Sequence, residues 1–374
     1  MAFSKIASGG VDGGVGDSLR PNAQPLFRNS DMAIAQRSTS VASLSSTSSY
    51  QTVDGFFTWL DNAGTWTMSQ DTDVPANTGI KKSVKWDCTT ATGTLNAGGY
   101  LIMEQRIEAQ DLQYAKYGTA NAEVLTLSFW IKATKTGTNI IEVYQPDADR
   151  YVSASYTVSS SNTWEKKTVL IPADTGGTIN NDNGDGLRVG WWFVAGSNYT
   201  SGTLATSWTS VTAANRTVGQ VNNGDSTSNN INLTGIQLEY GSYTADTIPP
   251  YQIESYGNNL SRCHRYFEHR GYTAANQQVF TGQTISSTKC TGPLFYAVKR
   301  SAPTITMGNA ICNNQHNGVG GTVTTKSTAQ IGLDTARFDV THNASNAGFA
   351  ITQGFGLVQL DNTTMEGIQF NSEL

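Results

Sequence analysis

Hydrophobic and polar residues alternate along most of the chain in short runs separated by turn residues. The clearest run has Leu125, Leu127, Phe129 and Ile131 at every second position. A period of two is typical of a β-strand with one face in a core. Comparable runs before residue 245 predict these strands: Gly55–Leu60, Thr65–Ser69, Ser83–Asp87, Tyr100–Ile107, Val124–Ala133, Asn139–Tyr144, Tyr151–Val158, Trp164–Ile171, Leu187–Ala195 and Ile231–Tyr240.

The order of these runs indicates how the strands assemble. No segment of helical period separates them, as the crossover helices of a parallel sheet would. We therefore expect a mainly β protein with an antiparallel, jelly-roll-like β-sandwich over residues 36–245. Shorter runs between Asn- and Gly-rich turns predict a smaller C-terminal β-domain over residues 265–374, with these strands: Thr291–Lys299, Thr304–Met307, Gly321–Lys326, Gln330–Leu333, Ala336–Thr341, Gly348–Gln353 and Phe355–Leu360.

Two adjacent prolines interrupt the strand pattern after the sandwich. Pro249 and Pro250 fix two backbone φ angles and supply no N–H donor, so the chain leaves the sheet as a stiff connector. Asn258 or Asn259 can then cap a short helix with an apolar face made by Leu260, Cys263 and Phe267. Residues 246–264 are thus predicted to be a proline elbow and a short helix that join the two domains.

Several short segments occur in an order found in one family: Asn29–Arg37, Val53–Phe56, Thr163–Lys167, Gln237–Glu239, Cys263–Glu268, Lys299–Thr304 and Ser372–Leu374. On these segments the chain resembles tailed-phage virion proteins, in which a carbohydrate-binding-module-like β-sandwich is linked to a small C-terminal β-domain. It departs from the family pattern at Gly55-Phe56 and at Tyr251-Gln252.

The resemblance implies a virion protein that is made in the host cytoplasm and is not an enzyme. A homotrimeric tail-fibre or adsorption-type protein, with host surface polysaccharide as its partner, is the first expectation. A head-fibre or capsid-decoration protein with a structural role in assembly is the alternative. A polysaccharide-degrading tailspike is the third, although the sequence contains no long internal repeat of the kind that a parallel β-helix shows.

Residues 1–35 differ from the rest of the chain. The glycine-rich run over residues 8–18 cannot bury enough apolar surface to fold by itself. Leu26 and Phe27 follow it in an apolar, extended segment with Pro21 and Pro25. We expect this segment to be an N-terminal virion-attachment arm, with Leu26 and Phe27 in contact with another virion protein.

Charge and composition exclude several other classes of protein. The net charge is −5, whereas a protein that holds nucleic acid by counterion release is expected to be basic. No apolar run approaches the ~20 residues that cross a bilayer, and we expect neither membrane insertion nor a signal peptide. The four cysteines have no CxxC spacing, which favours buried, reduced thiols.

The sequence offers little that is typical of catalysis. Cys263 and His264 are adjacent in sequence, but adjacent side chains on a helix point apart, and no motif of a nucleophilic or zinc enzyme occurs. No catalytic residue is therefore predicted. A glycosidase would need two facing carboxylates. The sequence supplies candidates without placing any pair at a working distance: Glu104, Glu108, Asp111, Glu123 and Glu142.

One loop has the composition of a cation site. Asp182, Asn183 and Asp185 lie beside Gly184 and Gly186 in residues 181–186, and carboxylate and amide oxygens can wrap Ca²⁺. The EF-hand pattern is incomplete, because Phe193 stands at the twelfth position where a Glu is required. A polar hairpin turn is the simpler interpretation. A structural Ca²⁺ is the alternative, and no other cofactor is expected.

Aromatic residues in the sandwich suggest sugar binding. Aromatic rings stack on the apolar face of a pyranose, while polar side chains bind its hydroxyls. Trp191 and Trp192 are adjacent on a predicted strand, so one can lie in the core while the other faces outward. The candidate carbohydrate-binding residues are Trp59, Trp66, Tyr144, Tyr151, Trp191, Trp192 and Tyr199.

Overall fold

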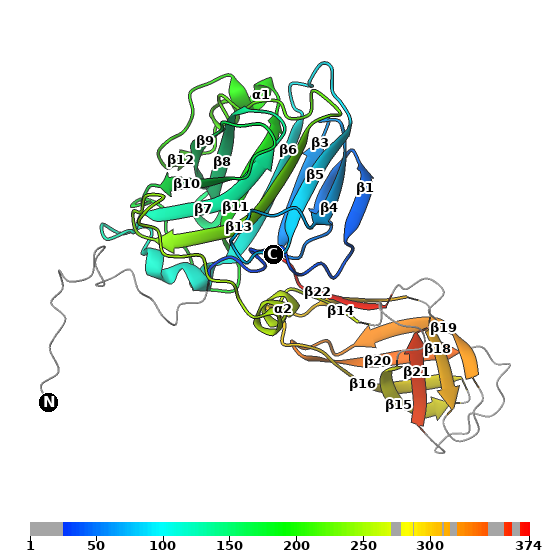
Figure 1. Ribbon diagram of the computed structural model, residues 1–374. Helices are drawn as coiled ribbons and strands as arrows, with labels where there is room; N and C mark the ends of the chain where they lie inside the picture. Colours follow the sequence, from blue (N-terminus) through cyan, green and yellow to red (C-terminus); the bar gives the residue numbers. More distant parts are fainter. Residues whose placement is uncertain are drawn as a thin grey trace, which may run out of the picture. The chain divides into compact units, whose positions relative to one another are not determined.

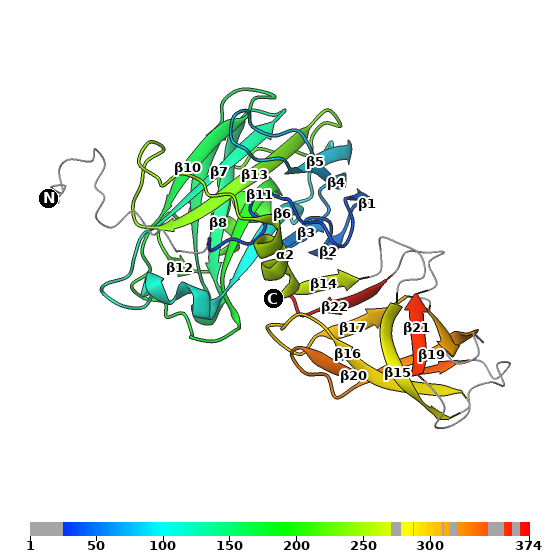
Figure 2. The ribbon, with the colours of Figure 1, turned by 60° about the horizontal axis from the view of Figure 1, so that its bottom comes forward.

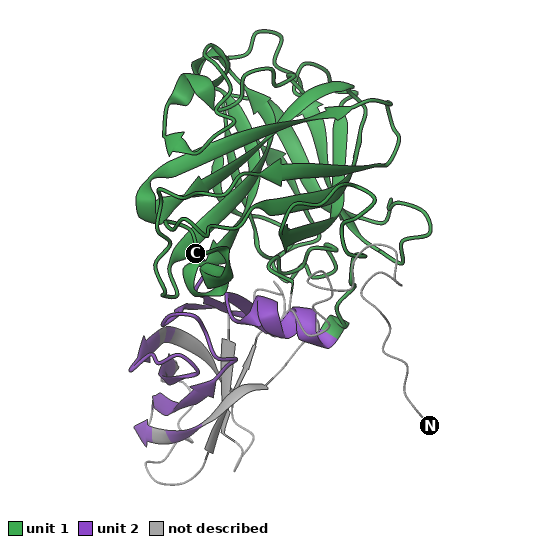
Figure 3. Ribbon diagram, turned by 90° about the vertical axis from the view of Figure 1, so that its left-hand side faces the viewer, with its two compact units in different colours: residues 1–256 green, residues 257–374 purple. Residues whose placement is uncertain are grey.

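The computed structural model describes residues 25–270, 278–286, 288–308, 310–314, 320–342, 355–360 and 367–374. The chain divides into two compact units, Met1–Tyr256 and Gly257–Leu374 (Figure 3). The described part of both units is built mainly from antiparallel strands, which confirms the predicted fold class. No helix in these ranges is long and apolar enough to cross a membrane.

Two sheets form the larger unit (Figures 1 and 2). The first has six strands in the order β1-β4-β5-β13-β7-β10. Their bounds are Ser40–Leu44 for β1, Thr65–Asp71 for β4, Ser83–Thr90 for β5, Asn230–Tyr240 for β13, Leu125–Ala133 for β7 and Glu165–Ile171 for β10.

The second sheet has seven strands in the order β12-β9-β8-β11-β6-β3-β2. Their bounds are Thr209–Ser210 for β12, Arg150–Val158 for β9, Gly137–Gln145 for β8, Asp185–Ala195 for β11, Tyr100–Glu108 for β6, Phe56–Asp61 for β3 and Thr47–Tyr50 for β2. Short helices interrupt the connections: η1 (Ala109–Ala115), η2 (Pro146–Ala148), α1 (Ser197–Thr200) and η3 (Ala213–Asn215).

The core of this unit lies between the two sheets. The Trp191 ring on β11 stands edge-on to Phe129 on β7, with 5.7 Å between ring centroids. Phe193, two residues further along β11, lies 6.5 Å from Trp86 on β5. All four side chains are completely buried. Their burial removes large apolar rings from water, which is the main driving force for stacking the sheets.

Phe27 and Met32 belong to this core, which contradicts the prediction that residues 1–35 form an attachment arm at these two positions. Phe27 is 1% exposed and its ring lies 6.1 Å from that of Trp191, and Leu26 packs on the same cluster. Arg28 and Gln105 exchange two hydrogen bonds, of 2.8 and 2.9 Å. Leu26 and Phe27 therefore pack on the sandwich core and do not form an exposed anchor. Residues 1–24 of the predicted arm lie outside the described residues.

The smaller unit begins with α2 (Tyr256–His264). Its three-stranded sheet has the order β14-β22-β17, formed by Phe267–Arg270, Ile368–Asn371 and Thr304–Met307. A closed barrel follows the order β15-β16-β20-β19-β18-β21. Its strands are β15 (Gln278–Ser286), β16 (Lys289–Phe295), β20 (Thr335–His342), β19 (Gly320–Ala329), β18 (Ala310–Asn314) and β21 (Phe355–Leu360).

Every strand predicted before residue 245 has a counterpart in the structure, with small shifts at the ends. The second unit was predicted less well. Gln330–Leu333 is not a strand, because Gln330 has a φ of 52° and starts a turn. The predicted strand Gly348–Gln353 lies outside the described residues. The helix α2 starts at Tyr256, so Asn258 and Asn259 lie within it and not at its cap.

Cys88, Cys263 and Cys290 are buried thiols that are not joined in disulfides, as predicted. The Cys88 thiol shows what burial does to such a group, since desolvation raises its pKa. A thiol with a raised pKa is a poor nucleophile at neutral pH. The side chain of Cys312 lies outside the described part of the structure.

Candidate functional site

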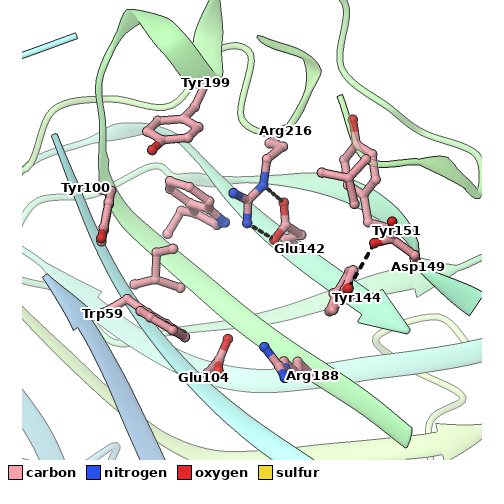
Figure 4. A pocket seen from close by; sticks show the side chains of 13 residues that line it. Trp59, Tyr100, Glu104, Glu142, Tyr144, Asp149, Tyr151, Arg188, Tyr199 and Arg216 are labelled. Atoms are coloured by element: carbon pink, nitrogen blue, oxygen red, sulfur yellow. Dashed lines mark hydrogen bonds and ion pairs between the residues drawn. The ribbon is translucent and has the colours of Figure 1, made fainter. Parts of the chain in front are cut away.

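A pocket of about 580 Å³ lies on the face of the seven-stranded sheet that points away from the core (Figure 4). Its volume falls within the range of roughly 300–1,000 Å³ that small-molecule sites occupy. Strands β3, β6, β11, β8 and β9 supply its floor. The opposite face of the same strands carries Trp191 and Phe193 into the core, so alternation along β11 separates a packing face from a pocket face.

A glycine lies at the centre of β11, two positions from each of the pocket residues Arg188 and Trp192 and therefore on the same face of the strand. Gly190 pairs with Glu104 on β6 and with Glu142 on β8. Across these three strands the two glutamates flank a position that has no side chain. A Cβ added at Gly190 would meet the Ile102 side chain at 3.2 Å and stand beside Glu104. The missing side chain therefore lets a ligand approach the sheet between two carboxylates.

Aromatic rings line one part of the pocket. Trp59 pairs with Ile102, and Ile102 pairs with Trp192 on the next strand. Tyr199 closes this end, with its ring 5.3 Å from Trp192 and 6.0 Å from Tyr100. Figure 4 shows Tyr100, Tyr199 and Trp59 around the hollow. These rings present an apolar wall of the kind that receives the apolar face of a sugar.

Arg216 links the aromatic part of the pocket to the polar part. Its Nε and Nη2 each donate a hydrogen bond of 2.6 Å to Glu142. Its guanidinium also lies 4.8 Å from the centre of the Trp192 ring. Burial alone would lower the pKa of Arg216, but the bond to Glu142 outweighs it and the pKa is raised. The guanidinium is therefore a fixed positive charge on the pocket wall.

A second set of charges lies along the floor. Glu104 accepts a hydrogen bond of 2.8 Å from Arg106 Nε. Arg188 Nε donates to Asp185 over 2.5 Å, and its guanidinium lies 5.5 Å from the Tyr144 ring centre. Burial raises the pKa of the Asp185 carboxyl although Arg188 opposes it. Glu104 and Asp185 thus each have an arginine beside them.

The polar end finishes at a turn between β8 and β9. The Tyr144 hydroxyl donates a hydrogen bond of 2.9 Å to Asp149. Burial and this carboxylate raise the pKa of Tyr144, so the hydroxyl keeps its proton. Asp149 has a φ of 50°, the left-handed conformation that Asp and Asn tolerate best. The turn holds one carboxylate at the rim of the pocket.

The connection between β11 and β13 forms the wall above the sheet. The carbonyl of Tyr199 accepts hydrogen bonds from the Thr217 backbone N–H and hydroxyl, at 2.9 and 3.1 Å. The Ser153 hydroxyl on β9 donates to the carbonyl of Arg216 over 2.7 Å. Tyr151 ties a further point of the connection to β9 through its hydroxyl and the Thr212 carbonyl, 3.1 Å apart. The wall is thereby fixed to the floor.

The structure brings most of the predicted carbohydrate-binding residues together. Trp59, Tyr144, Tyr151, Trp192 and Tyr199 line the pocket, although they come from four strands and the short helix α1. Trp192 and Tyr151 are 0% and 1% exposed, so they build the floor and wall beneath the more open rings.

Two of the predicted residues are not in the pocket. Trp66 and Trp191 are completely buried in the sandwich core and cannot contact a sugar. Large rings are mostly packed inside, and sequence alone did not show on which face of their strands these two would lie. Sequence reasoning also missed Tyr100, Asp149, Arg188 and Arg216. It named Glu104 and Glu142 only as members of a longer set of acids.

The candidate calcium loop has the contacts of a polar turn. The Asp182 carboxylate accepts a hydrogen bond of 2.8 Å from the Gly184 N–H. Asp185 is occupied by Arg188. Within the described ranges no group of three or more His, Cys, Asp or Glu side chains is placed to hold a metal ion. Calcium binding at Asp182, Asn183 and Asp185 stays a prediction.

Comparisons with known proteins give weak structural likenesses. No protein-family model and no curated protein matches the chain. The enzymatically active domain of bacteriophage CBA120 tailspike protein 4 is similar over 58% of this chain and 21% of its own, with 13% identity and a TM-score of 0.30. This chain therefore spans about a fifth of that tailspike structure.

Two carbohydrate-binding modules are similar at the same level. The structure of TmCBM61 in complex with β-1,4-galactotriose matches over 58% of this chain and 99% of its own, with 9% identity and a TM-score of 0.28. The N-terminal cellulose-binding domain of a Cellulomonas fimi β-1,4-glucanase matches over 51% and 91%, with 12% identity and a TM-score of 0.26. Likenesses at these scores carry no argument about function, which has to come from the pocket itself.

Proposed function

We propose that the chain is a glycan-binding protein without catalytic activity and that the pocket around Gly190 is its binding site. The observation that carries the proposal is the combination of an aromatic wall, charged hydrogen-bonding groups and a hollow floor on one face of a sheet. A sugar ring has an apolar face and a rim of hydroxyls, and the pocket offers a complement to each.

The side chains have separate roles in this proposal. Trp59, Tyr100 and Tyr199 provide ring surface for the apolar face of a pyranose. Glu104 and Asp149 accept hydrogen bonds from ligand hydroxyls. Arginine has five N–H donors, of which Arg216 uses Nε and Nη2 on Glu142 and Arg188 uses Nε on Asp185. Their remaining N–H groups can donate to ligand oxygens.

Binding without cleavage is favoured by how the two central carboxylates are held. Hydrolysis of a glycosidic bond needs one carboxyl group that gives a proton to the leaving oxygen. Glu104 and Glu142 flank Gly190, but each already accepts hydrogen bonds from an arginine. Neither is therefore placed as a free proton donor. The polysaccharide-degrading tailspike remains the third hypothesis.

The sequence resemblance extends the proposal to a biological setting. We propose a tailed-phage virion protein of the tail-fibre or adsorption type that contacts host surface polysaccharide. A homotrimer would present three such pockets, and linked weak sites gain affinity through effective concentration. A head-fibre or capsid-decoration protein is the alternative. Reconstruction of a particle that contains this chain, with density on the tail or on the capsid, would decide between them.

Glycan binding is tested with purified full-length protein on an array of bacterial surface polysaccharides. Gly190→Val should fill the hollow and abolish the signals, because the new side chain would project from the floor between Glu104 and Glu142. Gly93→Ala is the matched control, since nothing lies within 4 Å of a Cβ at that position. Its signals should equal those of the wild type.

Three results would count against the proposal. An array with no reproducible signal would favour the structural alternative. Equal signals from wild type and a folded Gly190→Val variant would move the binding site elsewhere. Release of new reducing ends from a bound polysaccharide would favour the tailspike hypothesis over binding alone.

A further inference from the structure

Almost every charged side chain of the pocket forms an ion pair with a side chain of opposite charge. Glu142 is held by Arg216, Glu104 by Arg106, and Arg188 by Asp185. Asp149 is different, because its only side-chain bond comes from the neutral Tyr144 hydroxyl and no cation in the described ranges pairs with it. The pocket therefore has no unneutralised guanidinium and one unneutralised carboxylate.

The balance of charge follows from these pairs. Three of the charged side chains that line the pocket are carboxylates and two are guanidiniums. Their ion-pair partners outside the lining, Arg106 and Asp185, add one of each sign. The site is thus negative by one charge, and the whole chain has a net charge of −5. An approaching anion meets repulsion both at long range and on contact.

A ligand carboxylate meets no guanidinium in the pocket that still lacks a counter-ion. The remaining N–H groups of Arg216 could donate to it, but Glu142 already neutralises that guanidinium, so the ligand would bring a second negative charge close to the Glu142 carboxylate. Displacing Glu142, whose side chain is 8% exposed, would leave a buried charge without its partner, which is strongly unfavourable. A neutral hydroxyl brings no charge, and it can donate to Glu104 or Asp149 and accept from an N–H that the arginines still have.

We infer that the pocket selects neutral glycans and discriminates against sugars that bear a carboxylate, sulfate or phosphate. This inference rests on the proposed glycan-binding function and narrows it to a ligand class. The ligand would place the apolar face of a ring against Trp59, Tyr100 and Tyr199. Its uncharged hydroxyls would lie over Glu104 and Asp149. In this arrangement Glu104 and Asp149 bind the hydroxyls of a neutral sugar and repel sugars that carry a negative charge.

The test uses matched polysaccharides that differ only at C6. The probes are β-1,4-linked mannan and glucan oligosaccharides and their uronic-acid counterparts, each titrated against the full-length protein by calorimetry, beside an array of neutral and acidic bacterial polysaccharides. Neutral probes should bind at least about tenfold more tightly than acidic ones at low salt. The difference in affinity between neutral and acidic probes should become smaller in 0.5 M NaCl, where the Debye length is only a few ångströms.

A conservative variant isolates the charge from the shape. Asn tolerates the left-handed φ of 50° at position 149, so Asp149→Asn removes one negative charge and keeps the turn. It should reduce the preference for neutral probes by about threefold or more at low salt. If the variant prefers neutral probes as strongly as the wild type does, the charge-based account is wrong. It is also wrong if salt does not change the difference in affinity between neutral and acidic probes.

The outcomes also separate this inference from the function on which it rests. Tighter binding of acidic glycans would overturn the inference and leave glycan binding intact. No detectable binding of any neutral or acidic polysaccharide would overturn both the inference and the glycan-binding function. Binding of neutral glycans that Gly190→Val abolishes, together with weak binding of their C6-oxidised forms, would support both.

Discussion

Arg216 donates two hydrogen bonds of 2.6 Å to Glu142 while its guanidinium lies 4.8 Å from the centre of the Trp192 ring. One side chain from a loop therefore neutralises a carboxylate on β8 and covers a ring on β11. A guanidinium suits both tasks, because it is planar, permanently charged and able to stack on an aromatic face.

Replacing Arg216 should reduce both affinity and stability. In Arg216→Ala the Glu142 carboxylate loses its partner while it remains mostly buried, which should lower the free energy of unfolding by about 1–3 kcal/mol. Glycan affinity should fall as well, because the pocket wall loses the N–H donors of Arg216 and the Trp192 ring loses the guanidinium that lies over it. Urea denaturation and calorimetric titration measure the two effects.

A double variant and a surface control complete this experiment. Arg216→Met with Glu142→Gln removes both charges together and should recover much of the lost stability without restoring affinity. Arg337→Ala, at a side chain that is 50% exposed, should change stability by no more than about 0.5 kcal/mol. Equal losses in the single and double variants would show that the pair does not act as a unit.

Trp59 should contribute to binding much more than to folding. Its ring is partly exposed at the edge of the pocket, so Trp59→Ala should weaken glycan binding about tenfold or more with a small change in melting temperature. Trp191→Ala is the matched comparison and should destabilise the fold by about 3–5 kcal/mol, because the ring is completely buried. Unchanged affinity in Trp59→Ala would remove this ring from the site.

Phe27 should behave as a core residue. Its side chain is 1% exposed and packs on Trp191, so Phe27→Ala should lower the free energy of unfolding by about 3–5 kcal/mol. Chemical denaturation followed by tryptophan fluorescence measures this directly. A loss below about 1 kcal/mol would contradict the position of Phe27 in the core.

The attachment hypothesis now concerns only residues 1–24. A deletion of residues 2–24 ends before Leu26 and Phe27 and therefore keeps both side chains on the sandwich core. If this segment anchors the protein, the deletion should abolish incorporation into particles. Normal incorporation of the shortened chain would refute the hypothesis, whereas a longer deletion that removes Phe27 would confuse attachment with unfolding.

The second unit should lose stability in acid because of one buried ion pair. Glu268 accepts a hydrogen bond of 2.8 Å from the Nζ of Lys299, whose side chain is 0% exposed. Burial raises the pKa of Glu268, but Lys299 outweighs this and the pKa lies below its ordinary value of 4.5. A depressed carboxyl pKa stabilises the folded state above the unfolded value and loses that contribution as pH falls through the folded one.

Calorimetric melting of the wild type between pH 7 and pH 3 should therefore show the second unit weakening below about pH 4.5. In Glu268→Gln the titrating group is absent, so the transition should be less stable at pH 7 and depend less on pH. Parallel pH profiles of wild type and variant would contradict a role for this carboxyl group.

The sandwich strands were readable from sequence because one face of each is buried. Leu125–Ala133 alternates clearly, since its odd positions face Trp191 and its neighbours. The sequence did not predict Ser40–Leu44 and Thr47–Tyr50 as strands. Both are edge strands rich in serine and mostly exposed or half-buried, so their apolar residues do not alternate with polar ones at a clear period of two. Their strand conformation depends on pairing with β4 and β3.

The pocket was only partly predictable, because its residues meet through long-range pairing. Sequence showed that Trp191 and Trp192 face opposite ways, which the structure confirms, but it did not show which one faces the core. Glu104 and Glu142 lie on strands that β11 separates, and only the strand order places them on either side of Gly190. Strand order is a property of the whole sheet and leaves no local signal.

The connection from Gly196 to Asn229 carries Tyr199 and Arg216 above the floor, and it adds to the sheet only the two-residue edge strand β12, which pairs with β9. Exchanges in this segment that keep β12 would therefore change one wall of the pocket while the pairing of β3, β6, β11 and β8 beneath it is kept. For the proposed glycan site, the ligand range can thus be altered from one side without rebuilding the sheet.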